Sequence, residues 1–269
     1  MSDWQEWLNL ILRWTHVIAG IMWIGQTYLF NWMEKAFEPT NGADPNIAGE
    51  LWMVHGGGFY LVEKQKWPKI MPRTLHWFKY EALITWISGF LLLAVVYWAG
   101  APLQDYAALM PRWQAVLISL GSLVGAVAVY RMIFRTPLGR SDLVGGIVWF
   151  ALVWAAAAGL MHVFSARAAY LHVGAMMGTV MMTNVWMTII PNQKKIMRIT
   201  EAGEPPRPEL SAAAKRCSKH NTYMSVPLIF AMLSNHYAAI TFGGPHPLVV
   251  LAVLMAAGAG AAHLIREHA

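Results

Sequence analysis

About seven apolar stretches, each long enough to cross a bilayer, constrain the fold of this chain most. They lie at about 5–30, 76–99, 113–134, 143–164, 168–190, 222–242 and 246–265. A transmembrane helix needs roughly 20 mostly apolar residues, and none of these stretches shows the period-two alternation of a barrel strand. The sequence therefore predicts an all-α bundle of about seven transmembrane helices, forming one integral-membrane domain over residues 1–269.

The composition agrees with a membrane protein and excludes several other classes. Charged residues make up 13% of the chain, well below the roughly 25% of a soluble domain. The net charge of +6 does not indicate a nucleic-acid-binding protein, because the basic residues lie between the apolar stretches. Cys217 is the only cysteine, which excludes an intramolecular disulfide, a cysteine-rich metal site and a covalent c-type haem. The first stretch lacks the features of a signal peptide and is expected to be retained.

The distribution of lysine and arginine predicts the orientation in the membrane. Basic residues gather in segments 31–75, 131–140 and 191–219, whereas the opposite connections hold only Arg112 and Arg167. By the positive-inside rule, the N-terminus lies outside and the C-terminus lies in the cytoplasm. Segment 31–75 is then a cytoplasmic functional loop, and segment 191–219 is a cytoplasmic basic loop.

One face of the first stretch carries groups that suit a flat cofactor. Arg13, His16 and Gly20 follow one another at spacings of three and four, so they share one side of a helix. The histidine can ligate a metal, the arginine can meet an acidic substituent, and the glycine leaves room for a ring. The alternative is a polar contact between helices in which the glycine permits close approach. We favour the cofactor, because ionisable residues inside a membrane are usually functional.

Three further histidines lie toward the middle and outer parts of the predicted bundle. His162 ends one stretch, His172 begins the next, and His236 is near the outer end of the sixth. Histidines on facing helices commonly hold haem in bundles. We therefore predict a bound haem b whose iron is ligated by members of the set His16, His162, His172 and His236, with the pairing left open.

The approach to the second stretch concentrates charged and aromatic residues. Gly56, Gly57 and Gly58 form either a backbone cradle for an anion or a tight bend. The segment Gly49–Pro72 forms a re-entrant element, an amphipathic surface helix or a lid, and the sequence leaves these forms open. If the stretch 50–62 enters the bilayer, the number of spans becomes eight. The candidate catalytic residues are His55, His76, Lys79 and Glu81, and the candidate substrate-binding residues are the three glycines and Lys64. For Lys79, a lysine that merely extends to the membrane surface is the alternative.

Long segments of the chain resemble a known family. The run ELWMVHGGGFYLVEKQKWPKIMPRTLHWFKYEALITWISGF and the run WTHVIAGIMWIGQTYLFNWME are similar to the membrane-bound, cytochrome-c-coupled urate oxidases. The likeness extends through AYLHVGAMMGTVMMTNVWMTIIPNQKK and RCSKHNTYMSVPLIFAMLSNH. The resemblance implies an oxidoreductase of purine catabolism in the bacterial inner (cytoplasmic) membrane, which oxidises urate and passes the electrons to a cytochrome c.

Members of that family join a multi-span domain to a C-terminal cytochrome c outside the membrane. This chain has no CxxCH motif and ends after the seventh stretch, so we expect a separate cytochrome c or other electron acceptor. Urate is a planar anion, which suits a basic, aromatic site on the cytoplasmic side. Membrane haem would pass its electrons across the bilayer. The expected partners are therefore urate or a related purine, an acceptor protein and lipid, with a homo-oligomer left open.

Two other functions remain open at this point. One is a haem-binding electron-transfer subunit that does not itself oxidise urate. The other is a transporter or channel that uses buried histidines as a proton relay. A transporter predicts no bound chromophore and often shows paired broken helices, and no such pairing is visible in the sequence.

Overall fold

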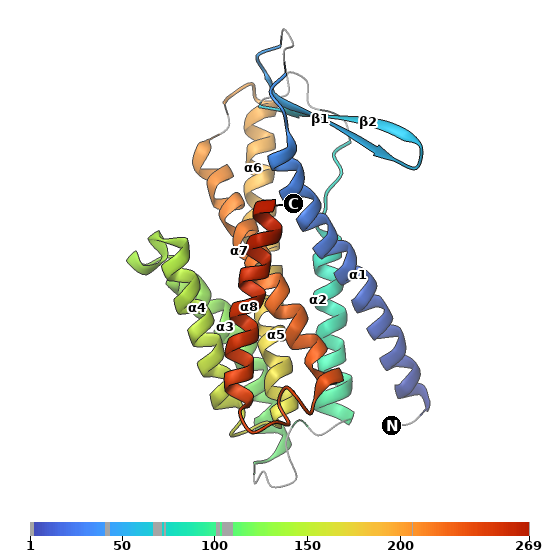
Figure 1. Ribbon diagram of the computed structural model, residues 1–269, viewed down its shortest axis with the longest axis vertical. Helices are drawn as coiled ribbons and strands as arrows, with labels where there is room; N and C mark the ends of the chain where they lie inside the picture. Colours follow the sequence, from blue (N-terminus) through green and yellow to red (C-terminus); the bar gives the residue numbers. More distant parts are fainter. Residues whose placement is uncertain are drawn as a thin grey trace.

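The computed structural model of the chain describes residues 3–40, 44–66, 72, 74–100, 103, 110–205 and 207–268. Most of them belong to long helices that lie alongside one another (Figure 1). The α-helices are α1 (Asp3–Ala36), α2 (Tyr80–Leu92), α3 (Arg112–Ile133), α4 (Asp142–Leu160), α5 (Ala166–Asn184), α6 (Ile190–Glu201), α7 (Pro208–Leu233) and α8 (Pro247–His268). The shorter elements are the strands β1 (Ile47–His55) and β2 (Gly58–Gln65), the π-helices η1 (Leu93–Gly100) and η3 (Val185–Ile189), and the 3-10 turns η2 (Pro137–Arg140) and η4 (Ser234–Tyr237).

The predicted all-α membrane bundle is confirmed. Six helical stretches of the described chain are long and apolar enough to cross a membrane: Asp3–Ala36, Tyr80–Ala99, Arg112–Ile133, Asp142–Leu160, Ala166–Glu201 and Pro247–His268. They correspond to the predicted stretches other than 222–242. In place of that stretch, α7 begins at Pro208, includes Lys215, Arg216 and Lys219, and ends at Leu233. It still lies inside the bundle, where it packs against α5 and α8.

The chain passes back and forth through the bundle. Figure 1 shows the N-terminus at the end opposite the β-hairpin, and the C-terminus toward the hairpin end. This agrees with the prediction that the two termini lie on opposite sides of a membrane. The hairpin end also contains the connections that carry the clusters of basic residues.

Helix α5 occupies the centre of the bundle and positions its neighbours. It contacts α2, α3, α4 and α7, and most of its side chains are buried, among them Tyr170, Val173, Met177 and Val180. Lipid is as apolar as these side chains, so close packing rather than escape from water stabilises such contacts. Because α5 is fixed on all sides, the π-helix η3 that follows it is also held in place.

Residues 47–65 form an antiparallel β-hairpin, so this part of the segment Gly49–Pro72 is not the amphipathic surface helix considered for it. Gly56 and Gly57 have φ angles of 58° and 80°, values that favour glycine and that a two-residue hairpin turn requires. The glycines therefore form the tight bend that was one of the two predicted alternatives. In Figure 1 the hairpin extends sideways past α1, so that its turn points away from the helices.

The segment 191–219 is also different from the prediction. It is mostly helical, because α6 continues to Glu201 and α7 starts at Pro208. The prediction of a basic loop was wrong there, because its charged residues occur at helical spacings and form the polar faces of two helices. These faces bring charged side chains to the hairpin end of the bundle.

Candidate functional site

Lys79 lies in an aromatic cage at the start of α2. Its Nζ atom is 5.4 Å from the ring centre of Trp77, 5.0 Å from that of Tyr80 and 5.8 Å from that of Trp186. Trp186 belongs to η3, so the cage joins two distant parts of the sequence. Within the described residues, no carboxylate forms an ion pair with Lys79. The Lys79 ammonium group is therefore held by aromatic rings, and its N–H groups remain available to bind another molecule.

Glu81, the second residue of α2, has a buried carboxylate in which only one oxygen has a hydrogen-bond partner. Its Oε1 atom accepts a long hydrogen bond of 3.4 Å from Gln26 of α1, and its Oε2 atom is buried without any partner. The indole N–H of Trp186 is likewise buried and unpartnered. Unpaired buried polar atoms are rare and costly, so they commonly mark a site where another group binds.

We call the residues Gln26, Trp77, Lys79, Tyr80, Glu81 and Trp186 the α2 site. They come from α1, the start of α2 and η3, and the apolar side chains of Ala82, Val185 and Ile190 pack behind them. A π-helix has poorer hydrogen-bond geometry than an α-helix and frequently occurs at functional sites. Here η3 widens the helix at the point where Trp186 reaches the cage. The arrangement combines a cation, flat rings and a carboxylate.

The other residues predicted for the substrate site lie elsewhere. His76 precedes α2, is exposed, and meets the edge of the Phe78 ring with ring centres 4.7 Å apart. His55 is exposed beside the hairpin turn. Lys64 forms a 2.6 Å ion pair with Glu34 of α1, which ties the hairpin to the bundle. Of the predicted set, only Lys79 and Glu81 belong to the α2 site.

His16 is the predicted haem ligand whose surroundings fit the role. Its Nδ1 atom is 2.8 Å from the backbone oxygen of Thr85, and a carbonyl only accepts, so Nδ1 carries the hydrogen. The Nε2 atom then keeps its lone pair, as in most metal-ligating histidines. Gly89 of α2 leaves the room for this ring, because a Cβ atom there would lie 2.8 Å from Cε1 of His16. Arg13 bonds to Asn9 on its own helix, with a distance of 2.8 Å.

The other predicted haem ligands do not fit. His172 is fully buried, and both ring nitrogens are engaged, with Ser119 Oγ at 2.7 Å and the Ala168 carbonyl at 2.7 Å. His162 and His236 are exposed near the ends of their helices. Among the described residues, no group of three or more His, Cys, Asp or Glu side chains is placed to hold a metal ion. Of the four predicted ligands, His16 therefore has the surroundings that best suit a metal ligand, and the bound haem stays a prediction.

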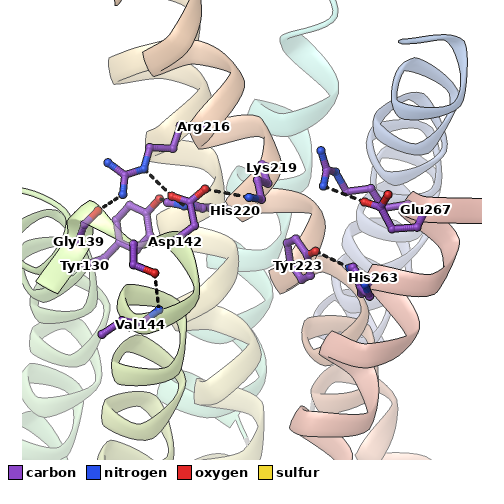
Figure 2. Close-up of polar contacts among 12 residues, drawn as sticks. Tyr130, Gly139, Asp142, Val144, Arg216, Lys219, His220, Tyr223, His263 and Glu267 are labelled. Carbon is purple, nitrogen blue, oxygen red and sulfur yellow. Dashed lines mark hydrogen bonds and ion pairs between the residues drawn. The ribbon is translucent and has the colours of Figure 1, made fainter. Parts of the chain in front are cut away.

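A second group of polar residues surrounds Asp142, the first residue of α4 (Figure 2). Its carboxylate accepts from Arg216 Nε at 2.7 Å, from Lys219 Nζ at 2.9 Å and from His220 Nε2 at 3.2 Å. Arg216 also donates to the carbonyl oxygen of Gly139. These contacts fix the polar half of α7 against the beginning of α4.

A chain of hydrogen bonds leads from this group into the bundle. His220 Nδ1 is 2.7 Å from the hydroxyl of Tyr130, which accepts from Asn184 at 3.0 Å. Asn184 also donates to Asn221 at 3.0 Å. Because Asn184 directly precedes η3, the chain ends beside the helix that supplies Trp186 to the α2 site. We call Asp142, His220, Tyr130, Asn184 and Asn221 the polar chain.

The sequence analysis missed the polar chain, although one signal was present. Arg216, Lys219 and His220 have spacings of three and four, so they lie on one face of α7 and together require an acidic partner. Asp142 stands alone at the start of an apolar helix, where such a partner is needed. Tyr130 and Asn184 gave no comparable signal, because single polar residues in apolar helices are often simple packing contacts.

Comparison with known proteins assigns the family. The family model described as "Urate oxidase N-terminal" matches residues 2–269, which is almost the whole chain. Searches of curated proteins and of solved structures gave no match. The match agrees with the apolar helices, which make the chain a multi-pass membrane protein. The chain therefore belongs to the urate oxidase N-terminal family.

Proposed function

We propose that this chain is a membrane-bound oxidoreductase that oxidises urate, or a similar purine, at the α2 site and passes the electrons to a separate acceptor. The family supports a relationship to urate oxidases. The observation that carries the proposal is the unpartnered Oε2 atom of Glu81, which lies two residues along the chain from the caged Lys79. A planar anion supplies what this site lacks, because it offers negative charge to Lys79, a flat face to the rings and N–H groups to the carboxylate.

Each residue of the site then has a chemical role. Lys79 attracts the anion, and Trp77, Tyr80 and Trp186 provide faces for stacking. Glu81 accepts a hydrogen bond from a ring N–H and takes up the proton that leaves as urate loses electrons.

The orientation follows from the basic residues. Lys64, Lys215 and Arg216 belong to the hairpin end of the bundle, as does the start of α2, so we propose that this end faces the cytoplasm of a bacterial cell. Urate made in the cytoplasm then reaches the α2 site directly. We expect Phe59→Cys in a Cys217→Ser background to react with a membrane-impermeant maleimide only after cells are opened. A matching Tyr237→Cys variant, at the other end, should react in intact cells, and the reverse pattern would overturn this orientation.

A haem would be held by His16 through Nε2. When bound, it supplies a one-electron carrier inside the membrane. We expect His16→Ala to remove the visible haem absorption of the purified protein, whereas His162→Ala and His236→Ala keep it, because those two side chains are exposed. Equal haem content in all three variants would show that His16 is not a ligand.

The function is tested by mixing the purified protein with urate and a water-soluble electron acceptor in the absence of oxygen. We expect urate to be consumed in step with reduction of the acceptor. If the protein accepts electrons from dithionite but not from urate, it is an electron-transfer subunit and the proposal fails. If it neither consumes urate nor takes up electrons, a transport function becomes the better explanation.

A further inference from the structure

A cavity lies on the other side of the bundle from the α1–α2 pair, between α4 and α8, with α3 and α7 beneath it. Its volume is about 720 Å³, within the roughly 300–1,000 Å³ of small-molecule sites. The long walls are apolar, with Ile147, Phe150 and Trp154 on α4 and Ala252, Met255 and Ala256 on α8. None of these residues belongs to the α2 site.

The cavity connects the core of the bundle with its outer surface. Trp149 and Met255 border it and are almost fully buried, with exposed fractions of 3%. Leu143 and Ile147 border it as well, and their exposed fractions are 73% and 61%. Since the outer surface of a membrane-spanning helix faces lipid, the cavity is open to the bilayer and suits a molecule that has an apolar part.

One end of the cavity is polar. Asp142, Lys219 and His220 line it there, together with Tyr223 and His263, whose hydroxyl oxygen and Nδ1 atom are 2.8 Å apart. Lys219 Nζ has one acceptor, the Asp142 carboxylate, so further N–H groups stay free in this part of the chain. His263 Nε2 forms no hydrogen bond to any described residue. This end of the cavity therefore suits a molecule that has hydrogen-bond acceptors at its polar end.

Two kinds of bilayer molecule carry hydrogen-bond acceptors: phospholipids, in their anionic head groups, and neutral ring compounds with carbonyl oxygens. The charge and the shape of the cavity distinguish between them. The anionic head of a phospholipid would lie beside the carboxylate of Asp142 and compete with it for Lys219, which weakens the ion cluster. A neutral ring with carbonyl oxygens avoids that repulsion. The rings of Tyr223 and His263 are nearly parallel, at 20° to each other, and with Phe150 and Trp154 they offer flat surfaces. These features favour a flat, uncharged ring.

We propose that this cavity binds the ring of a lipid-soluble quinone, with the tail leaving between α4 and α8. Building on the proposed function, the quinone is then the electron acceptor. Urate and water lose two electrons and two protons to give a hydroxylated product. The quinone takes up two electrons and two protons, so that both carbonyl groups become hydroxyl groups. His263 and Tyr223 line the polar end of the cavity, so they are placed to deliver protons to one carbonyl.

Binding is tested apart from urate oxidation. The purified full chain in phosphatidylcholine nanodiscs is irradiated with a photoreactive short-chain quinone, and the labelled peptides are located by mass spectrometry. We expect labels on α4 and α8 that unlabelled quinone displaces. Ala256→Trp fills the cavity and should weaken labelling at least tenfold, whereas Ala257→Trp, the next residue and exposed but outside the cavity, should leave it unchanged.

His263→Gln gives a second, independent variant that does not fill the cavity, and it should weaken labelling by a similar factor. Equal labelling in all variants, or a co-purified phospholipid that quinone does not displace, overturns the quinone proposal. The outcome is separable from that of the proposed function. If the protein binds quinone but consumes no urate, only the proposed urate oxidation is disproved. If it reduces a water-soluble acceptor with urate but binds no quinone, only the quinone proposal is disproved.

Discussion

Glu81→Gln is expected to lower the turnover of urate by about 100-fold or more, since general-base catalysis typically contributes 10²–10⁴-fold. The glutamine keeps the size of the side chain and the contact with Gln26, but it cannot take up a proton. The affinity for urate should change much less, because Lys79 and the rings remain. Steady-state kinetics with a water-soluble acceptor measure both quantities, and the expected change is in kcat.

The same variant is expected to unfold at the same temperature as the native protein or at a higher one. The Oε2 atom of Glu81 is buried without a partner, and an unpaired buried carboxylate destabilises a fold. A residue kept for structure alone would show the opposite, a loss of stability with the loss of activity. Measuring the apparent Tm beside the kinetics therefore separates the catalytic role of Glu81 from a structural one.

Glu63→Gln is the matched control. Glu63 lies in β2, its side chain is exposed, and the substitution makes the same chemical change. It should leave kcat, KM and Tm within experimental error of the native values. If Glu81→Gln also stays within threefold of the native turnover while urate is still consumed, the base is another group, and His76 is the next residue to substitute.

The helices could be predicted from the sequence because their cause is local. About 20 apolar residues in a row form a helix in a membrane whatever lies next to them, since every backbone group must be bonded internally. The hairpin could not be predicted in this way. Its strands have large apolar residues on both faces, so they lack the alternation that identifies a half-buried strand, and only the glycine turn was visible.

The candidate site depends on neighbours that periodicity does not give. Helical spacing showed that Arg13 and His16 share a face of α1, but not that His16 would meet Thr85 and Gly89 of α2. Lys79 and Glu81 were predicted from their unusual position, charged residues at the entry of an apolar helix. Trp186 reaches the α2 site because η3 places it there. The chain has 14 tryptophans, and nothing in the sequence distinguishes this one from the others.

Asp142→Asn is expected to have the second large effect, this time on stability. Asp142 is the shared acceptor of Arg216, Lys219 and His220, so its neutralisation leaves two cations side by side on α7. Removing one partner from a buried ion pair costs about 3–5 kcal/mol. The three charged side chains here are about one-third exposed, so we expect roughly 1–3 kcal/mol after screening by solvent. For a chain of this size that corresponds to a fall in Tm of roughly 2–10 °C.

Thermal unfolding in detergent measures this effect. Glu267→Gln is the control, because its ion pair with Lys35 lies at the surface and its loss should leave the Tm almost unchanged. Lys219→Met identifies the cause. If charge imbalance destabilises Asp142→Asn, the double variant should be more stable than the sum of the two single changes predicts. Strict additivity would instead mean that Asp142 acts through the start of α4, by its position in the first turn, and not through the cations of α7.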